Sequence, residues 1–198
     1  MIGSLRGVLL DKEPPFLLLE VGGVGYEVEA PLSTCFKLPD VGEQVCLKTH
    51  LLVREDQHTL FGFSTDSERR LFRDLLKVSG IGAKIALGVL SGMTVEAFVR
   101  AVETEDVAAL VRLPGIGRKT AERLVIEMRD RVRHPALAGS LGGGKPASEP
   151  RAEALDALVA LGYKAPEARR MLDRVPESVT STEDLLRTVL RSAAAPRG

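Results

Sequence analysis

The stretch "LPGIGRKTAERL" (residues 113–124) places Gly-Ile-Gly directly before a run of helix-forming residues. A second stretch, "VSGIGAKIALGV" (78–89), has the same hydrophobic-x-Gly-Ile-Gly-x-Lys-x-Ala order 35 residues earlier in the chain. Two copies of one pattern at a fixed spacing predict a repeated structural unit. This repeated unit is therefore the first candidate for the functional site.

Each Gly-Ile-Gly stretch predicts a cradle for a phosphate group. A helix that begins directly after glycines presents unpaired backbone N–H groups and the positive end of its dipole, and glycines let an anion approach closely. We expect Ile81 and Ile116 to turn inward and fix the turn. This is the helix-hairpin-helix pattern, which holds the DNA backbone without reading bases. The residues expected to contact DNA are Gly80, Gly82, Lys84, Gly115, Gly117, Arg118, Lys119, Thr120 and Arg123.

The alternative is that Gly-x-Gly merely ends one helix and starts the next. The repetition weakens it, because both copies carry a lysine four residues after the first glycine, at Lys84 and Lys119. Arg129, Arg131 and Arg133 follow the second copy and could form a solvated helix face. Beside a cradle, they are better interpreted as an extension of the DNA footprint.

Charge and composition point to the same part of the chain. The 198 residues balance 27 Lys and Arg against 27 Asp and Glu, but residues 1–63 carry 5 basic and 9 acidic side chains, a net charge of −4. Residues 64–135 carry 13 and 10, a net of +3, and residues 136–198 carry 9 and 8, a net of +1. The middle segment is therefore the expected site for a polyanion. Only 4% of residues are aromatic, which argues against a surface built on base stacking.

The pattern of residues predicts an α+β chain of several domains. Five short β-prone segments, separated by turn residues, suit a small closed barrel of the OB type. A capping-box pattern, "TDSE" (65–68), then begins a helical region. A stretch rich in Gly, Pro, Ser and Ala predicts a flexible linker before three short amphipathic helices, the last capped by Ser181. The expected domains are a barrel at 1–63, tandem helix-hairpin-helices at 64–135, a linker at 136–150 and a three-helix domain at 151–198.

Catalytic chemistry is not expected. His50, His58 and His134 lack metal-ligand spacing, so no metal or cofactor is predicted. The stretch "GSLGGGKP" (139–146) matches part of a nucleotide-binding P-loop, but Pro146 occupies the position of the Mg²⁺-binding hydroxyl and no strand precedes it. The hairpin of a repair glycosylase would resemble a Gly-Pro-Gly turn followed by a catalytic Asp. No such Asp follows closely after the second hairpin of this chain.

Other features suggest a cytoplasmic protein without a membrane partner. The N-terminus lacks the apolar core and cleavage site of a signal peptide, and no run approaches membrane-spanning length. Cys35 and Cys46 are expected to be half-buried free thiols of a reducing compartment.

The N-terminal "MIGSLRG", the hairpins "GIGAKIAL" and "LPGIGRKTAERL", the Gly-rich linker and the terminal helices together resemble the RuvA family of Holliday-junction-binding subunits. The resemblance covers all three segments. It implies an OB barrel, a tandem helix-hairpin-helix domain, a mobile C-terminal domain, and a homotetramer, possibly an octamer, that holds a four-way junction open. It also implies a RuvB hexameric ATPase motor as partner, and a RuvC resolvase in the larger complex.

The resemblance also assigns two further sites. From composition alone, Glu55 and Asp56 are an ordinary polar hairpin turn. The family carries an acidic pin here, which implies that the pair repels phosphates at the junction centre. In this sequence Arg54 precedes the pair, and its positive charge would reduce that repulsion. The last segment is similar to ubiquitin-associated three-helix modules. Its candidate motor-binding residues are Leu158, Leu161, Tyr163 and Leu172, although for most of these packing in the core of the module is the favoured interpretation.

The function expected from sequence is therefore that of a non-catalytic, structure-specific DNA-binding subunit. It would cradle junction arms and recruit and regulate a branch-migration motor in recombination and DNA repair. Two alternatives stay open: a helix-hairpin-helix repair enzyme, and a general duplex-binding module.

Overall fold

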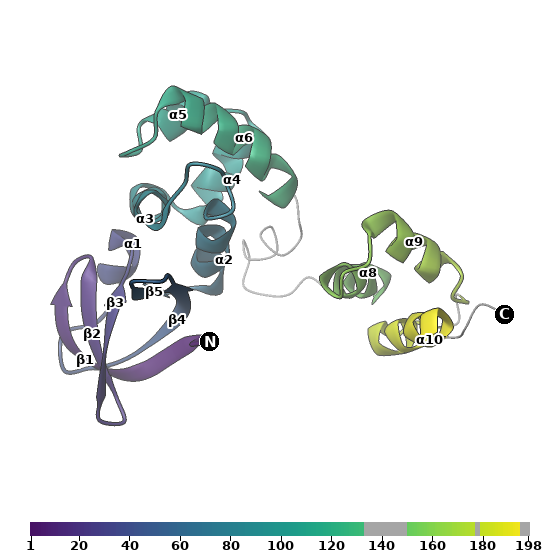
Figure 1. The fold of residues 1–198 in the computed structure, drawn as a ribbon, viewed down its shortest axis with the longest axis horizontal. Helices are drawn as coiled ribbons and strands as arrows, with labels where there is room; N and C mark the ends of the chain where they lie inside the picture. The colour runs from purple at the N-terminus through teal and green to yellow at the C-terminus, as the bar shows by residue number, and fades with distance from the viewer. Residues whose placement is uncertain (133–149, 177–178, 195–198) are drawn as a thin grey trace. The chain divides into compact units, whose positions relative to one another are not determined.

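The computed structural model of the chain describes residues 1–132, 150–176 and 179–194 (Figure 1). These residues belong to two compact units, one within Met1–Leu141 and one within Gly142–Gly198. Apart from Pro150, which begins a helix, the predicted linker lies outside the described residues, as do the P-loop-like stretch at 139–146, Arg133 and His134.

The first unit begins with a closed five-stranded barrel, which confirms the OB-like prediction. Its strands pair in the order β1-β2-β3-β5-β4, and all neighbours are antiparallel except β3 and β5. The barrel closes where Glu29 pairs with Phe61. The strands are β1 (Ser4–Glu13), β2 (Phe16–Val21), β3 (Val24–Glu29), β4 (Gln44–Val53) and β5 (His58–Phe63).

Alternating side chains fill the barrel, as the period of a strand requires. Leu17, Leu47 and Val28 are almost completely buried. A Cβ at Gly62 would lie 2.5 Å from Val28 Cγ1 and 3.0 Å from Leu47 Cδ1, so only glycine lets the barrel close at this point.

Two details of this region were not predicted. A short helix, α1 (Leu32–Cys35), connects β3 to β4 where only turns were expected. The two cysteines also differ from the predicted half-buried pair, because Cys35 is completely buried and Cys46 is exposed. Burial raises the pKa of the Cys35 thiol.

Helices make up most of the described remainder of the first unit, to residue 132, as the change of periodicity at Thr65 predicts. The helices are α2 (Asp66–Leu75), α3 (Ala83–Gly92), α4 (Val95–Glu103), α5 (Val107–Val111) and α6 (Arg118–Val132). They enclose one apolar core that includes Phe72, Leu90 and Leu124. Polar side chains cap the N-termini of three helices: Thr65 caps α2, Thr94 caps α4 and Asp106 caps α5.

The barrel and the helices share this core. Only Ser64 and Thr65 separate β5 from α2. The ring of Phe72 lies 4.9 Å from that of Phe61 and 5.0 Å from that of Phe63, measured between centroids. Aromatic rings at these distances attract one another beyond the effect of burial alone.

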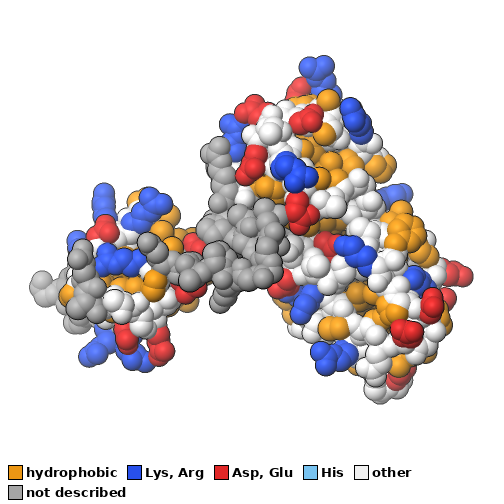
Figure 2. Space-filling model, turned by 180° about the vertical axis from the view of Figure 1, so that it is seen from behind, with side chains coloured by type: hydrophobic (Ala, Val, Ile, Leu, Met, Phe, Trp, Pro, Cys, Tyr) orange, Lys and Arg blue, Asp and Glu red, His pale blue; other side chains and the backbone are white. Residues whose placement is uncertain are grey.

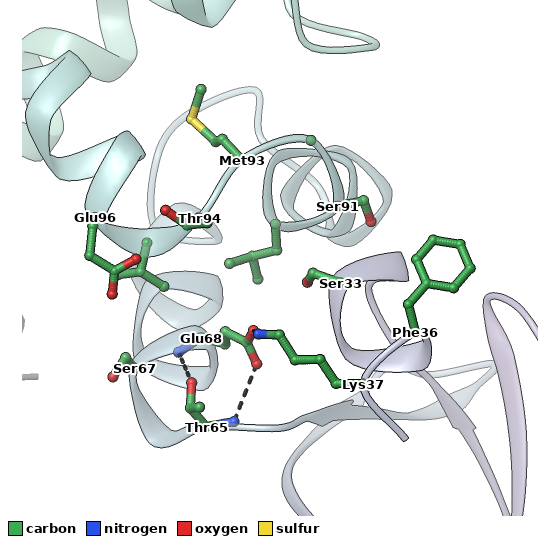
Figure 3. Close-up of a pocket in the computed structure, with 13 residues that line it drawn as sticks. Ser33, Phe36, Lys37, Thr65, Ser67, Glu68, Ser91, Met93, Thr94 and Glu96 are labelled. Carbon is green, nitrogen blue, oxygen red and sulfur yellow. Dashed lines mark hydrogen bonds and ion pairs between the residues drawn. The ribbon is translucent and has the colours of Figure 1, made fainter. Parts of the chain in front are cut away.

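Glu68 completes the predicted capping box and also joins α1 to α2. Its carboxylate accepts hydrogen bonds from the Thr65 backbone N–H (3.2 Å) and the Ser64 hydroxyl (2.7 Å), besides Thr34 Oγ1 and Lys37 Nζ, both at 3.3 Å. Figure 3 shows this carboxylate between Thr65 and Lys37, in a hollow of about 520 Å³ that α1, α3 and the start of α4 also line. A buried carboxylate is tolerated here because its oxygens are satisfied by these donors.

His50 of β4 packs against α2 at the same seam. Its ring meets that of Phe72 edge-on, with centroids 5.7 Å apart, and its Nδ1 accepts a hydrogen bond of 3.2 Å from Arg73 Nε. Burial lowers the pKa of His50, and the positive charges of Arg73 and Arg69 lower it further.

The described residues of the second unit form three helices, as predicted. They are α8 (Pro150–Ala160), α9 (Ala165–Asp173) and α10 (Thr182–Ala194), packed around Leu158, Leu172 and Leu185. The hydroxyl of Ser181 accepts a hydrogen bond of 3.4 Å from the Asp184 N–H, which confirms the predicted cap.

Among the described residues, no single helix has the length and apolarity needed to cross a membrane; by length and composition alone, α3 and α4 pass that test only as a pair, bent by 98°.

Candidate nucleic-acid interface

The two Gly-Ile-Gly stretches form turns with the same backbone hydrogen bond. The Ile81 N–H donates to the Val78 carbonyl (3.1 Å), and the Ile116 N–H donates to the Leu113 carbonyl (3.2 Å). Both isoleucines are buried, which confirms that they point inward. The first glycine of each turn is left-handed, with φ of +86° at Gly80 and +79° at Gly115. A side chain at either position would strain the turn.

The second glycine of each turn leaves the following helix open. A Cβ at Gly82 or Gly117 would meet no atom within 4 Å, so the backbone there faces free space. Gly82 is the N-cap of α3, and no side chain caps this helix, in contrast to α2, α4 and α5. The first N–H groups of α3 are therefore available to an external acceptor, as an anion cradle requires.

The charged side chains expected to contact DNA surround these openings. Lys84, Lys119 and Arg118 are exposed and lie in the first turns of α3 and α6, whereas Thr120 is half-buried. Arg118 Nε forms an ion pair of 3.0 Å with Glu122, which tempers its charge. The two lysines are therefore the side chains best placed to meet a phosphate at each cradle.

The other arginines of α6 contact the protein itself. Arg131 Nη1 donates to the Asp74 carbonyl at the end of α2 (2.9 Å), and Arg129 forms an ion pair with Glu105. These contacts give both arginines a structural role that the sequence did not predict, and the half-buried Arg131 holds α6 against α2. Their part in the DNA footprint stays a prediction. Arg123 is exposed, although its Nη1 donates to the Ser79 carbonyl of the first turn (3.0 Å).

Glu55 and Asp56 occupy the turn between β4 and β5. Both are exposed, and the turn is closed by a hydrogen bond of 2.9 Å from the Arg54 N–H to the Gln57 carbonyl. This geometry fits an ordinary turn and an acidic pin equally, so the pin stays a prediction.

A groove of about 310 Å³ joins this turn to the first cradle. Arg54 and Gln57 line it from the barrel, and Gly82 and Lys84 line it from α3. Glu29 also contributes, and burial raises the pKa of its carboxyl. No sequence pattern marks Gln57 or Glu29, because the groove arises from residues that are distant along the chain.

Surface charge does not by itself mark a DNA-binding face in the view of Figure 2. Lys and Arg side chains are interspersed with Asp and Glu over this face of the described residues. Mixed charges produce a weak field at a distance. The local geometry of the cradles is therefore a stronger indication of DNA binding than net charge.

The four apolar residues predicted to bind a motor divide into two groups. Leu158 and Leu172 fill the core of the second unit, so their side chains are not accessible. Leu161 is 62% exposed at the turn after α8, and Tyr163 is partly buried against the core. Burial corrects the predicted set to Leu161 and the accessible part of Tyr163.

No group of three His, Cys, Asp or Glu side chains within residues 1–132, 150–176 and 179–194 is arranged to hold a metal ion.

Comparisons with known proteins match the chain along most of its length. Residues 1–62 match a family model described as the RuvA N terminal domain, residues 72–130 a SAM-like helix-hairpin-helix tandem, and residues 149–194 the RuvA C-terminal domain. Three similar proteins are each named Holliday junction branch migration complex subunit RuvA. The one from Thioalkalivibrio sulfidiphilus is 58% identical over 97% of this chain and 98% of its own. Those from Methylococcus capsulatus and Escherichia coli are 54% and 50% identical, over 98% of this chain and 99% and 100% of their own.

Proposed function

The chain belongs to the RuvA family, and on that premise we propose that it is the Holliday-junction-binding subunit of a branch migration complex. Such a subunit acts in DNA recombination and repair. Its substrate is four-way junction DNA, which it holds through the phosphate backbone.

The observation that carries this proposal is the pair of open helix N-termini in one compact unit. The turns before α3 and α6 share one hydrogen-bond pattern, and each presents glycine backbone and a lysine to solvent. Two such sites on one body suit two phosphates of a duplex arm without reading its sequence.

In this proposal, the acidic pin makes the protein prefer four-way junctions to continuous duplex. Glu55 and Asp56 project from the barrel turn, and the groove lined by Arg54 and Lys84 leads from that turn to the first cradle. A DNA strand that leaves the crossover can follow this groove to the cradle. A continuous duplex would instead have to lie across the carboxylates, whose charge repels its phosphates.

We extend the proposal to the assembly that the family implies. Four copies would gather their pins around the crossover, and a pair of tetramers could enclose it. The second unit, through Leu161 and Tyr163, would dock a RuvB ATPase motor, and a RuvC resolvase would join the larger complex. In this arrangement the chain itself is non-catalytic and needs no cofactor, because the motor hydrolyses ATP, and it works in the cytoplasm.

A direct test titrates the purified protein against a labelled four-way junction and a labelled linear duplex at one fixed salt concentration, with and without Mg²⁺ and ATP. We expect tighter binding to the junction and no cleavage of either DNA. Equal affinities would identify a general duplex-binding module, and cleavage would identify a repair enzyme.

A further inference from the structure

The two hairpins are related position by position, with an offset of 35 residues. Val78 and Leu113 accept the equivalent turn hydrogen bond, Gly80 and Gly115 are both left-handed, and the hairpin isoleucines are both buried. The same offset pairs Ser79 with Pro114, and Gly88 of α3 with Arg123 of α6. Residues that break this equivalence show how the two cradles differ.

The break occurs where each helix touches the other hairpin. Arg123 of α6 donates to the carbonyl of Ser79 in the first turn, at 3.0 Å. At the equivalent contact, α3 presents Gly88, where a Cβ would lie 3.6 Å from the carbonyl oxygen of Pro114. The first turn is thus held by a cationic side chain, whereas the second packs directly against a helix backbone.

The first turn also contacts Arg123 at a second position, besides this hydrogen bond. A Cβ at Gly80 would lie 3.7 Å from Arg123 Nη1, so the left-handed residue of the turn lies against the guanidinium. Two helical turns further along α6, Arg131 Nη1 donates to the Asp74 carbonyl at 2.9 Å. α6 therefore holds the first hairpin at both ends, by its turn and by the last residues of α2.

We propose that Arg123 is a positioning residue, which fixes the first phosphate cradle relative to the second by holding the Ser79 carbonyl. The inference rests on the proposed DNA-binding function and deepens it. The guanidinium has five N–H donors in a rigid fork, so one can hold the carbonyl while others stay free. Because Arg123 is exposed beside Gly80, these donors are available to a phosphate at the first cradle.

A positioning role can be told from a simple phosphate contact by a measurement on the protein without DNA. Arg123→Met keeps most of the apolar stem of the side chain and removes its N–H donors. We expect amide hydrogen exchange at Ile81, whose N–H closes the first turn, to become faster by at least roughly tenfold, the low end of what one hydrogen bond to a charged group supplies. Exchange at Ile116 in the second turn serves as the internal control and should not change.

The role also predicts which contacts are coupled in DNA binding. In double-mutant cycles on junction DNA, Lys84→Ala should weaken binding less in the Arg123→Met background than in the wild type, because the first cradle is already displaced. Lys119→Ala should weaken binding by the same factor in both backgrounds. Arg123→Lys keeps the charge, so its DNA binding should depend on salt as strongly as that of the wild type. Its exchange rate at Ile81 should lie between those of the wild type and Arg123→Met.

The inference is overturned if exchange at Ile81 is the same in wild type and Arg123→Met, or if Arg123 couples equally to Lys84 and Lys119. Thermal unfolding of each variant checks that the fold is intact. The exchange measurement uses free protein, so a wild-type chain that fails to bind junctions would contradict the proposed function and leave this result standing.

Discussion

A serine at Gly82 tests the first cradle by giving opposite effects on stability and DNA binding. Gly82 is the N-cap of α3, with φ of −94° and ψ of 174°, and a Cβ there meets no atom within 4 Å. The fold therefore accepts Gly82→Ser without strain. The new hydroxyl can accept a hydrogen bond from the N–H of Lys84 or Ile85, as an N-cap serine does.

The two magnitudes follow from that one hydrogen bond. A serine cap stabilises a helix by a few tenths of a kcal/mol over glycine, which raises Tm by about 1 °C in a chain of this size. The same hydroxyl occupies the N–H group that would otherwise bind phosphate. Losing a hydrogen bond to a charged group costs about 1.5–3 kcal/mol, so DNA affinity should fall roughly tenfold to a hundredfold.

Gly82→Ala is the matched control, because it adds a methyl group without an acceptor. The stability order should be serine, glycine, alanine, measured by thermal unfolding, since alanine is the poorest cap of the three. The affinity order, from titrations at one salt concentration, should be glycine, alanine, serine. If Gly82→Ser raises Tm and binds junction DNA as tightly as the wild type, phosphate does not occupy this helix end and the cradle assignment is wrong.

Three further predictions concern the pin, the second unit and pH. Glu55→Gln with Asp56→Asn should strengthen duplex binding and lower the junction-to-duplex affinity ratio, and an unchanged ratio in paired titrations would reduce the pair to a plain turn. A chain ending at Val132 should bind junctions normally but fail in motor-driven branch migration; a folded truncation that no longer binds would place DNA contacts in the second unit. Because burial and Arg73 lower the pKa of His50, the unfolded state binds the extra proton more readily, so stability should fall as pH drops below about 6.5. The free energy of unfolding, measured with denaturant between pH 5 and 8, should depend less steeply on pH in His50→Gln than in the wild type. The same pH dependence in both proteins would contradict this account.

Local patterns predicted the strands and helices well because each is encoded within a few residues. The turns at Pro14–Pro15 and Gly22–Gly23 bound the first strands in sequence and structure alike. The Thr65 capping box was visible because both partners lie three residues apart. Helix α1 was missed because four residues are too few to show a period.

Contacts between distant residues were not predictable in the same way. The sequence marks Arg131 as basic, but its carbonyl partner is 57 positions away, and only the fold brings the two together. Likewise, the groove that joins Arg54 to Lys84 depends on how the barrel meets α3. The cradle glycines were identified because their spacing recurs, whereas the different supports of the two cradles, Arg123 and Gly88, follow only from packing.

If a motor pulls the DNA, as the proposed function has it, the short connection between β5 and α2 has a mechanical consequence. Tension on a DNA arm would reach the barrel through Ser64 and Thr65, the Glu68 hydrogen bonds and the packed rings around Phe72. None of these is a soft hinge, because Thr65 caps α2 and the side chains of Glu68 and Phe72 are buried. The pin turn and the cradles would therefore move as one rigid body. Force applied to a DNA arm would then act on the crossover and would not be dissipated by deformation of the protein.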